Sequence, residues 1–88
     1  MKITDVRVKV LEKNSENRLR GVASITIDDV FVVHDIRLID GENGIFVAMP
    51  SKKLSNGEFK DIAHPINQET RHIIENMVLE AYNKEVQI

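Results

Sequence analysis

The sequence lacks several features that would each point to a class of protein. It has no cysteine, which excludes disulfide bonds, thiol catalysis and thiolate zinc sites. It has no apolar run of signal-peptide length near its start, and no segment approaches the roughly 20 apolar residues of a membrane span. We therefore expect a soluble, cytoplasmic protein without membrane contact.

Aromatic residues and excess positive charge are also scarce. Three Phe and one Tyr are the only aromatic residues. Most of them are expected in the core rather than in a paired stacking platform of the kind used by the commonest RNA-binding sheets. The formal charge is −2, from 12 Lys and Arg against 14 Asp and Glu. A non-specific nucleic-acid coat is expected to be basic overall, so any phosphate binding must come from a local patch.

The remaining composition is that of a globular protein. Hydrophobic residues make up 42% and charged residues 30% of the 88 residues, which is ordinary for a folded domain and too apolar for disorder. A chain of this length leaves no room for a second core. We expect one domain over residues 1–88.

Alternation of apolar and polar residues predicts that the first two thirds of the chain form strands. Tight turns are expected at Asp28-Asp29 and at the Asn-Gly pairs 43–44 and 56–57. The polar segment 12–17 is expected to be a loop, and Pro50 should end the fourth strand because it has no amide hydrogen. The predicted strands are 2–11, 18–28, 30–39, 45–49 and a weaker one near 58–63.

The last third changes to helical periodicity. Asn67 can cap a helix over about 68–84, and Pro65 favours an extended entrance to it. The helix carries one apolar stripe of Ile73, Ile74, Met77, Val78, Ala81 and Tyr82. The predicted fold is α+β: an antiparallel sheet of four to five strands built from hairpins, followed by one C-terminal amphipathic helix.

Two predicted strands are apolar on both faces. In the fourth, Ile45, Val47 and Met49 oppose Phe46 and Ala48. In the third, strict alternation places Val30, Val32, Ile36 and Leu38 opposite Phe31, Val33 and Ile39. Such a sheet needs two covers, and the chain supplies one helix. A second copy most simply provides the other cover, so we expect a homodimer.

Residues able to bind a metal are present but poorly arranged. His34, Asp35, Asp61 and His64 could in principle form a divalent-cation site. Adjacent strand residues such as His34 and Asp35 point to opposite faces, however, and His34 has the parity of a core histidine. We predict no metal and no other cofactor.

Enzymatic motifs are absent. The segment Gly41-Glu42-Asn43-Gly44 lacks the Lys-Ser/Thr of a P-loop, and a turn explains it better. None of the four serines has the surroundings of a nucleophile elbow. We expect neither an enzyme nor a small-molecule substrate.

The tripeptide Ser51-Lys52-Lys53 is the best candidate for a binding site. It follows Pro50, so its two ammonium groups should leave a strand end on a short loop where they can contact phosphates. The alternative is that these lysines only solubilise a loop and protect a sheet edge. Further candidate contacts are Lys60, Arg18 and Arg20, if the hairpins lie side by side, and Arg71 at the helix start.

Several segments resemble one protein family, named SpoVG after stage V sporulation protein G and also described as a septation protein family. The matching segments are 1–7 (MKITDVR), 23–26 (ASIT), 31–37 (FVVHDIR), 39–41 (IDG), 46–52 (FVAMPSK), 57–59 (GEF) and 61–67 (DIAHPIN). The likeness runs from residue 1 to about residue 82.

The resemblance implies a small bacterial cytoplasmic regulator that forms dimers, binds DNA and RNA and affects septation or sporulation. It also implies nucleic-acid contact by Ser51, Lys52 and Lys53. Lys53 stands where many members have Arg, which weakens bidentate contacts, and segment 12–17 is longer than the usual first connection. The alternative function is a dimeric protein-interaction module that acts on a regulator or a division component.

Overall fold

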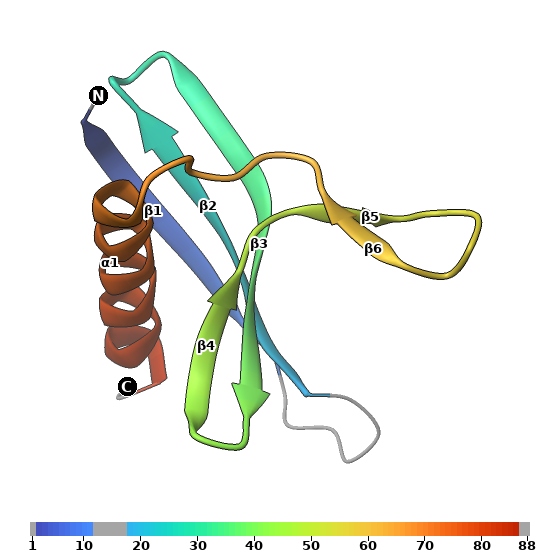
Figure 1. Ribbon diagram of the computed structural model, residues 1–88. Coiled ribbons are helices and arrows are strands. Elements are labelled where there is room, and N and C mark those ends of the chain that lie inside the picture. The colour runs from blue at the N-terminus through green and yellow to red at the C-terminus, as the bar shows by residue number, and fades with distance from the viewer. Residues whose placement is uncertain (1, 12–17, 87–88) are drawn as a thin grey trace.

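A computed structural model describes residues 2–11 and 18–86. The predicted loop at 12–17 lies outside them. Figure 1 shows a twisted sheet with one helix against it and a separate hairpin that projects sideways. The elements are β1 (Ile3–Val10), β2 (Leu19–Ile27), β3 (Phe31–Gly41), β4 (Gly44–Ala48), β5 (Ser51–Lys53), β6 (Phe59–Asp61) and α1 (Gln68–Val86).

The main sheet has the order β1-β2-β3-β4, and every neighbouring pair is antiparallel. Strands β5 and β6 pair only with each other, in a second two-stranded sheet. The predicted α+β class, its hairpin topology and the C-terminal helix are therefore confirmed.

The turn between β2 and β3 is as tight as predicted. The connection has three residues, 28–30, and the Val30 amide donates to the Ile27 carbonyl at 3.0 Å. Asp28 and Asp29 both have positive φ angles, 51° and 59°, as the two central residues of a type I′ turn do. Two hydrogen bonds between backbone amides and side-chain oxygens stabilise this turn. The Lys2 amide donates to Asp28 Oδ1 at 3.0 Å, and the Asp29 amide donates to Thr4 Oγ1 at 3.0 Å. These bonds tie the start of β1 to the turn.

The predicted faces of the third strand are wrong because β3 contains a β-bulge. Ala23 pairs with Ile36 and Ile25 pairs with Val33, so the two residues between them, His34 and Asp35, oppose a single residue of β2. Asp35 takes a φ of 64° at this point. The extra residue reverses the alternation, so Val33 joins Ile36 on the covered face. His34 is consequently exposed and is not the core histidine that strict alternation predicted.

Helix α1 covers one face of the main sheet. Asn67 caps it as predicted, since its Oδ1 accepts the Thr70 amide at 2.7 Å. Most of the predicted stripe faces inward: Val78 is fully buried and Ile74 is buried, whereas Ile73 is 46% exposed. The buried core consists of Ala23, Ile25, Ile36, Leu38, Val47, Met49, Ile74 and Val78.

Within the described residues, no helix covers the other face of the main sheet, and Ser51 meets it at Arg37. This open face carries an apolar group from β2, β3 and β4, formed by Val22, Ile39, Phe46 and Ala48, with Arg37 paired between Val22 and Ala48. Phe46 is 49% exposed and its ring lies over Gly41, where an added Cβ would come within 2.9 Å of Cε1. The predicted two-sided character of the fourth strand is confirmed.

The prediction that most aromatic residues lie in the core is wrong. Phe31, Phe46 and Phe59 are all exposed, and Tyr82 is only partly buried. The core is built from aliphatic side chains and Met49 instead. Among the described residues, no helix is long and apolar enough to cross a membrane.

Candidate nucleic-acid interface

The segment Ser51-Lys52-Lys53 forms strand β5, so the prediction that it lies on a loop is wrong. Pro50 ends β4 because it cannot donate a backbone hydrogen bond. Its carbonyl nevertheless accepts the Ile62 amide at 2.7 Å, and this bond begins a new ladder with β6. Strands β5 and β6 form a hairpin over residues 51–61, which we call the arm. Figure 1 shows the arm extending away from both the sheet and the helix.

The tip of the arm folds through local hydrogen bonds. The Leu54 amide donates to the Glu58 carbonyl at 2.7 Å, and the Gly57 amide donates to the Leu54 carbonyl at 3.0 Å. Asn56 Oδ1 accepts the Glu58 amide at 3.0 Å, and Gly57 has a φ of 90°. The predicted Asn-Gly turn is therefore present, and it sets the register of β5 against β6.

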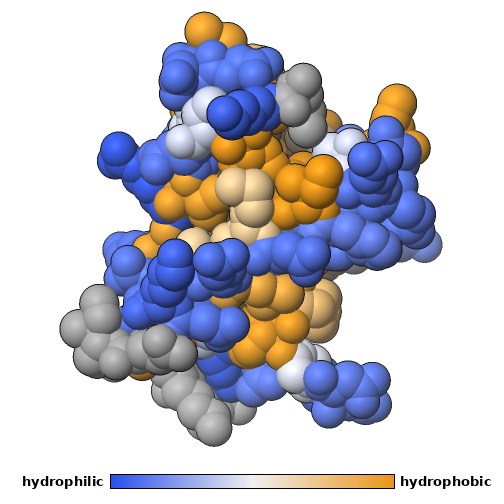
Figure 2. Space-filling model, turned by 90° about the vertical axis from the view of Figure 1, so that its left-hand side faces the viewer, coloured by the Kyte–Doolittle hydropathy of each residue, from blue (hydrophilic) through white to orange (hydrophobic). Residues whose placement is uncertain are grey.

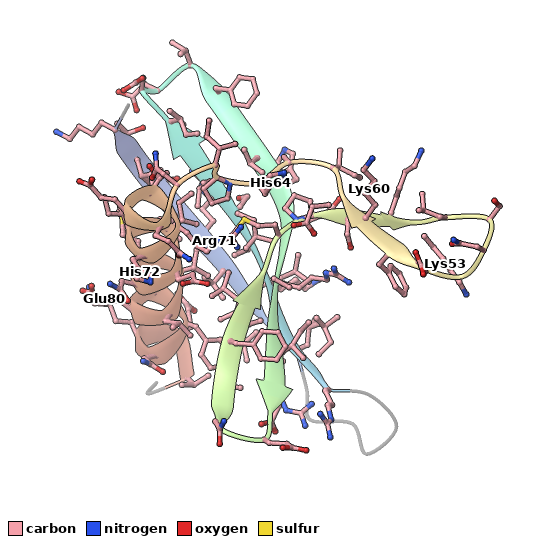
Figure 3. The ribbon with its side chains drawn as sticks, in the orientation of Figure 1. Lys53, Lys60, His64, Arg71, His72 and Glu80 are labelled. Carbon is pink, nitrogen blue, oxygen red and sulfur yellow. The ribbon has the colours of Figure 1, made fainter. Side chains whose placement is uncertain are left out.

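This register brings three predicted site residues together. Lys52 pairs with Lys60 across the arm, and Lys53 pairs with Phe59. Paired residues share a face of a two-stranded sheet and successive residues alternate, so Lys52 and Lys60 lie on one face and Lys53 on the other. Figure 3 shows Lys53 and Lys60 pointing to opposite sides of the arm. All three lysines are exposed.

The pairing of Lys52 with Lys60 is unfavourable for the arm itself. Like charges directly opposite each other in an antiparallel pair destabilise it, by a fraction of a kcal/mol to about 1 kcal/mol. No carboxylate shares this face within the paired strands, because Asp61 is paired with Ser51 on the other face. The two lysines therefore share one exposed face of the arm, where an anion could neutralise both charges.

Ser51 connects the arm to the main sheet. The guanidinium of Arg37 in β3 donates from Nη2 to Ser51 Oγ at 2.6 Å, and the bond is partly buried. Sequence reasoning missed Arg37, because an Arg between two apolar residues of a strand looks like any outward-facing polar residue. Only the long-range hydrogen bond to Ser51 distinguishes it.

The remaining predicted site residues do not join the arm. Arg20 is an internal ion-pair residue: its side chain is 12% exposed and its Nη2 lies 3.4 Å from Asp40 Oδ2. Arg18 lies beside it, and its carbonyl accepts the Asp40 amide at 2.8 Å. Arg71 occupies the first turns of α1, and Figure 3 places it well away from the arm. The structure thus brings together Ser51, Lys52, Lys53 and Lys60, but not Arg18, Arg20 or Arg71.

The residues considered for a metal site also lie apart. His64 is exposed, and its Nδ1 lies 3.1 Å from the Pro65 carbonyl oxygen. In residues 2–11 and 18–86, no group of three or more His, Asp or Glu side chains could hold a metal ion.

A second surface feature is an apolar hollow of about 140 Å³ between the main sheet and the segment that leads into α1. Val33, Met49, Pro65 and Ile74 are among its lining residues. Exposed apolar side chains occur in the same entrance segment, where Ile62 is 66% and Ile66 is 91% exposed. Figure 2 views the molecule from the side of α1 and shows apolar surface between hydrophilic bands.

Comparison with known proteins identifies close relatives over nearly the whole chain. The model of the SpoVG family matches residues 1–84. A relative from Agathobacter rectalis is 56% identical over 87 residues, which cover 99% of this chain and 98% of the relative. One from Lachnospira eligens is 61% identical over 84 residues, covering 96% and 93%.

A third relative, from Aster yellows witches'-broom phytoplasma, is 62% identical over 82 residues, covering 93% of this chain and 81% of the relative. All three carry the name "Putative septation protein SpoVG". The family model and these identities agree with the resemblance seen in the sequence. The chain belongs to the SpoVG family.

Proposed function

We propose that this protein is a site-selective DNA- and RNA-binding regulator of bacteria that binds nucleic acid as a dimer through its arm. The cross-strand pair Lys52–Lys60, with Lys53 beside it, carries this proposal. These lysines are exposed on a projecting element, although the chain as a whole is acidic. Phosphate neutralisation would remove the repulsion that the hairpin otherwise bears.

The dimer is supported by the open face of the main sheet. Its apolar group includes Phe46, which is 49% exposed, and nothing in the described part of the chain covers it. A two-fold dimer would bury this group and present two arms, which would raise affinity for one nucleic acid through effective concentration. The septation named in the relatives would be controlled through expression of the bound genes or transcripts.

The test is a salt titration of binding. Lys52→Ala combined with Lys60→Ala should weaken binding to DNA and RNA broadly. The slope of log K against log salt should become shallower by about 0.9 for each duplex phosphate that the variant no longer neutralises. The matched control is Lys2→Ala with Lys84→Ala, which removes the same charge from exposed positions outside the arm. Equal weakening in both double variants would show that only net charge matters.

A protein-interaction module is the second candidate, and the apolar hollow favours it. Exposed Ile62 and Ile66 beside a hollow lined by Met49 and Ile74 resemble a groove for an apolar peptide segment. A pull-down from nuclease-treated lysate separates the two functions. A partner that survives nuclease and no longer binds Ile66→Glu would favour this module.

A further inference from the structure

Phe59 lies outside the buried core of the described fold. It lies in β6 and is 65% exposed. The arm that carries it pairs with itself and is not among the elements that pack around the core. An exposed Phe on a hairpin lowers solubility without adding to the core, which points to a use outside the folded monomer.

The neighbour of Phe59 indicates what that use is. Phe59 is directly opposite Lys53, on the face of the arm that does not carry Lys52 and Lys60. Side chains paired across antiparallel strands have Cβ atoms about 4.5–5.5 Å apart, so an aromatic and a cationic side chain leave the arm from neighbouring positions on one face. A nucleotide has the same two features, a flat base and a phosphate next to it.

We propose that Phe59 stacks on an unpaired base while Lys53 contacts the adjacent phosphate, so that this face of the arm binds single-stranded nucleic acid. The inference rests on the proposed function and extends it, because it gives the two faces of the arm different roles. Lys52 and Lys60 offer charge alone, which suits any phosphate backbone, duplex or single-stranded. The Lys53–Phe59 face requires a base whose flat side is free, which a duplex does not offer.

The position of Asp61 limits where a nucleic-acid strand can cross the arm. Its carboxylate shares this face with Phe59 and lies next to the body of the protein, opposite Ser51. A phosphate would be repelled there and attracted by Lys53, nearer the tip. The bound strand should therefore cross the arm at the Lys53–Phe59 pair rather than run along it toward Asp61. Stacking is tolerant of sequence because every base has a π face, so this interaction selects strandedness and not a particular base.

The test compares Phe59→Leu and Phe59→Tyr in the full chain. The probes are a single strand of mixed sequence, about 20 nucleotides long and containing 2-aminopurine, and the duplex of the same sequence. Phe59→Leu should weaken single-strand binding by roughly 5- to 100-fold and abolish quenching of the 2-aminopurine, since alanine substitution of stacking aromatics has effects of this order. Phe59→Tyr keeps a ring and should retain both. Duplex affinity and the salt slope should stay unchanged in both variants, because neither changes a charge.

Three results would overturn the inference. Unchanged single-strand affinity in Phe59→Leu would show that the ring does not stack on a base. Equal weakening on the single strand and the duplex would mean that Phe59 only shapes the arm. A change of sedimentation state in Phe59→Leu would place Phe59 in an interface between copies. If the Lys52→Ala, Lys60→Ala variant and a Lys53→Ala variant also bind normally, the proposed function fails; if they bind more weakly and Phe59→Leu does not, only this inference fails.

Discussion

The body of the molecule, formed by the main sheet and α1, and the arm are stabilised in different ways. The body buries eight apolar side chains between sheet and helix. The arm buries none, and five of the six residues in its strands are exposed. Its order depends on a short ladder, one turn and the bond from Arg37 to Ser51. An isolated two-stranded hairpin is marginally stable in water. We therefore expect that a binding partner could stabilise the arm without changing the packing of the core.

The largest expected difference between the two regions is in truncation of apolar side chains. Leu38 is fully buried at the centre of the core, so Leu38→Ala should lower the free energy of unfolding by about 2–5 kcal/mol. Phe59→Ala removes a larger side chain from the arm but should change the free energy of unfolding by less than about 0.5 kcal/mol. Urea unfolding followed by circular dichroism measures both. Comparable decreases would mean that the arm packs against something in solution.

The next largest effect concerns the open face. Phe46→Glu places a charge in the apolar group that we expect a second copy to cover, and should raise the dimer dissociation constant by about 30-fold or more. Analytical ultracentrifugation over a concentration series measures this. Ile66→Glu is the control, since Ile66 is 91% exposed and lies beside the apolar hollow. Dissociation caused by Ile66→Glu alone would assign the second copy to the hollow.

The connection between body and arm gives a third prediction. Arg37→Ala removes a hydrogen bond from a charged donor to Ser51, a type worth about 1.5 kcal/mol or more when buried and less here because it is only partly buried. Hydrogen exchange should therefore speed up at the Ile62 amide, which bonds to Pro50 at the base of the arm, while amides in β2 stay protected. Arg7→Ala is the control, because the Arg7–Asp5 ion pair is exposed. Equal exchange at Ile62 in both variants would show that Arg37 does not hold the arm.

The sequence was a better guide to the body than to the arm. Periodicity predicts the strands and α1 because long, half-buried elements repeat their pattern over many residues. The extra residue at His34–Asp35 makes the predicted faces of β3 wrong, because the alternation of apolar and polar residues does not reveal a bulge. Strand β5 has three residues, too few for a period. The Arg37–Ser51 bond joins residues 14 apart and follows from topology, not from local pattern.

Two glycines give the smallest expected effect, because both occupy turns with a positive φ angle but belong to different regions. Gly44, in the β3–β4 hairpin of the body, has a φ of 114°, and Gly57, at the tip of the arm, has a φ of 90°. An added Cβ meets nothing within 4 Å at either position, so alanine introduces only backbone strain, of about 1–3 kcal/mol. Gly44→Ala should lower the global free energy of unfolding by this amount. Gly57→Ala should leave the global value unchanged and raise exchange only at arm amides such as that of Leu54. A global decrease in Gly57→Ala would show that the arm unfolds together with the body, and the division of the molecule into a packed body and an independently unfolding arm would then be wrong.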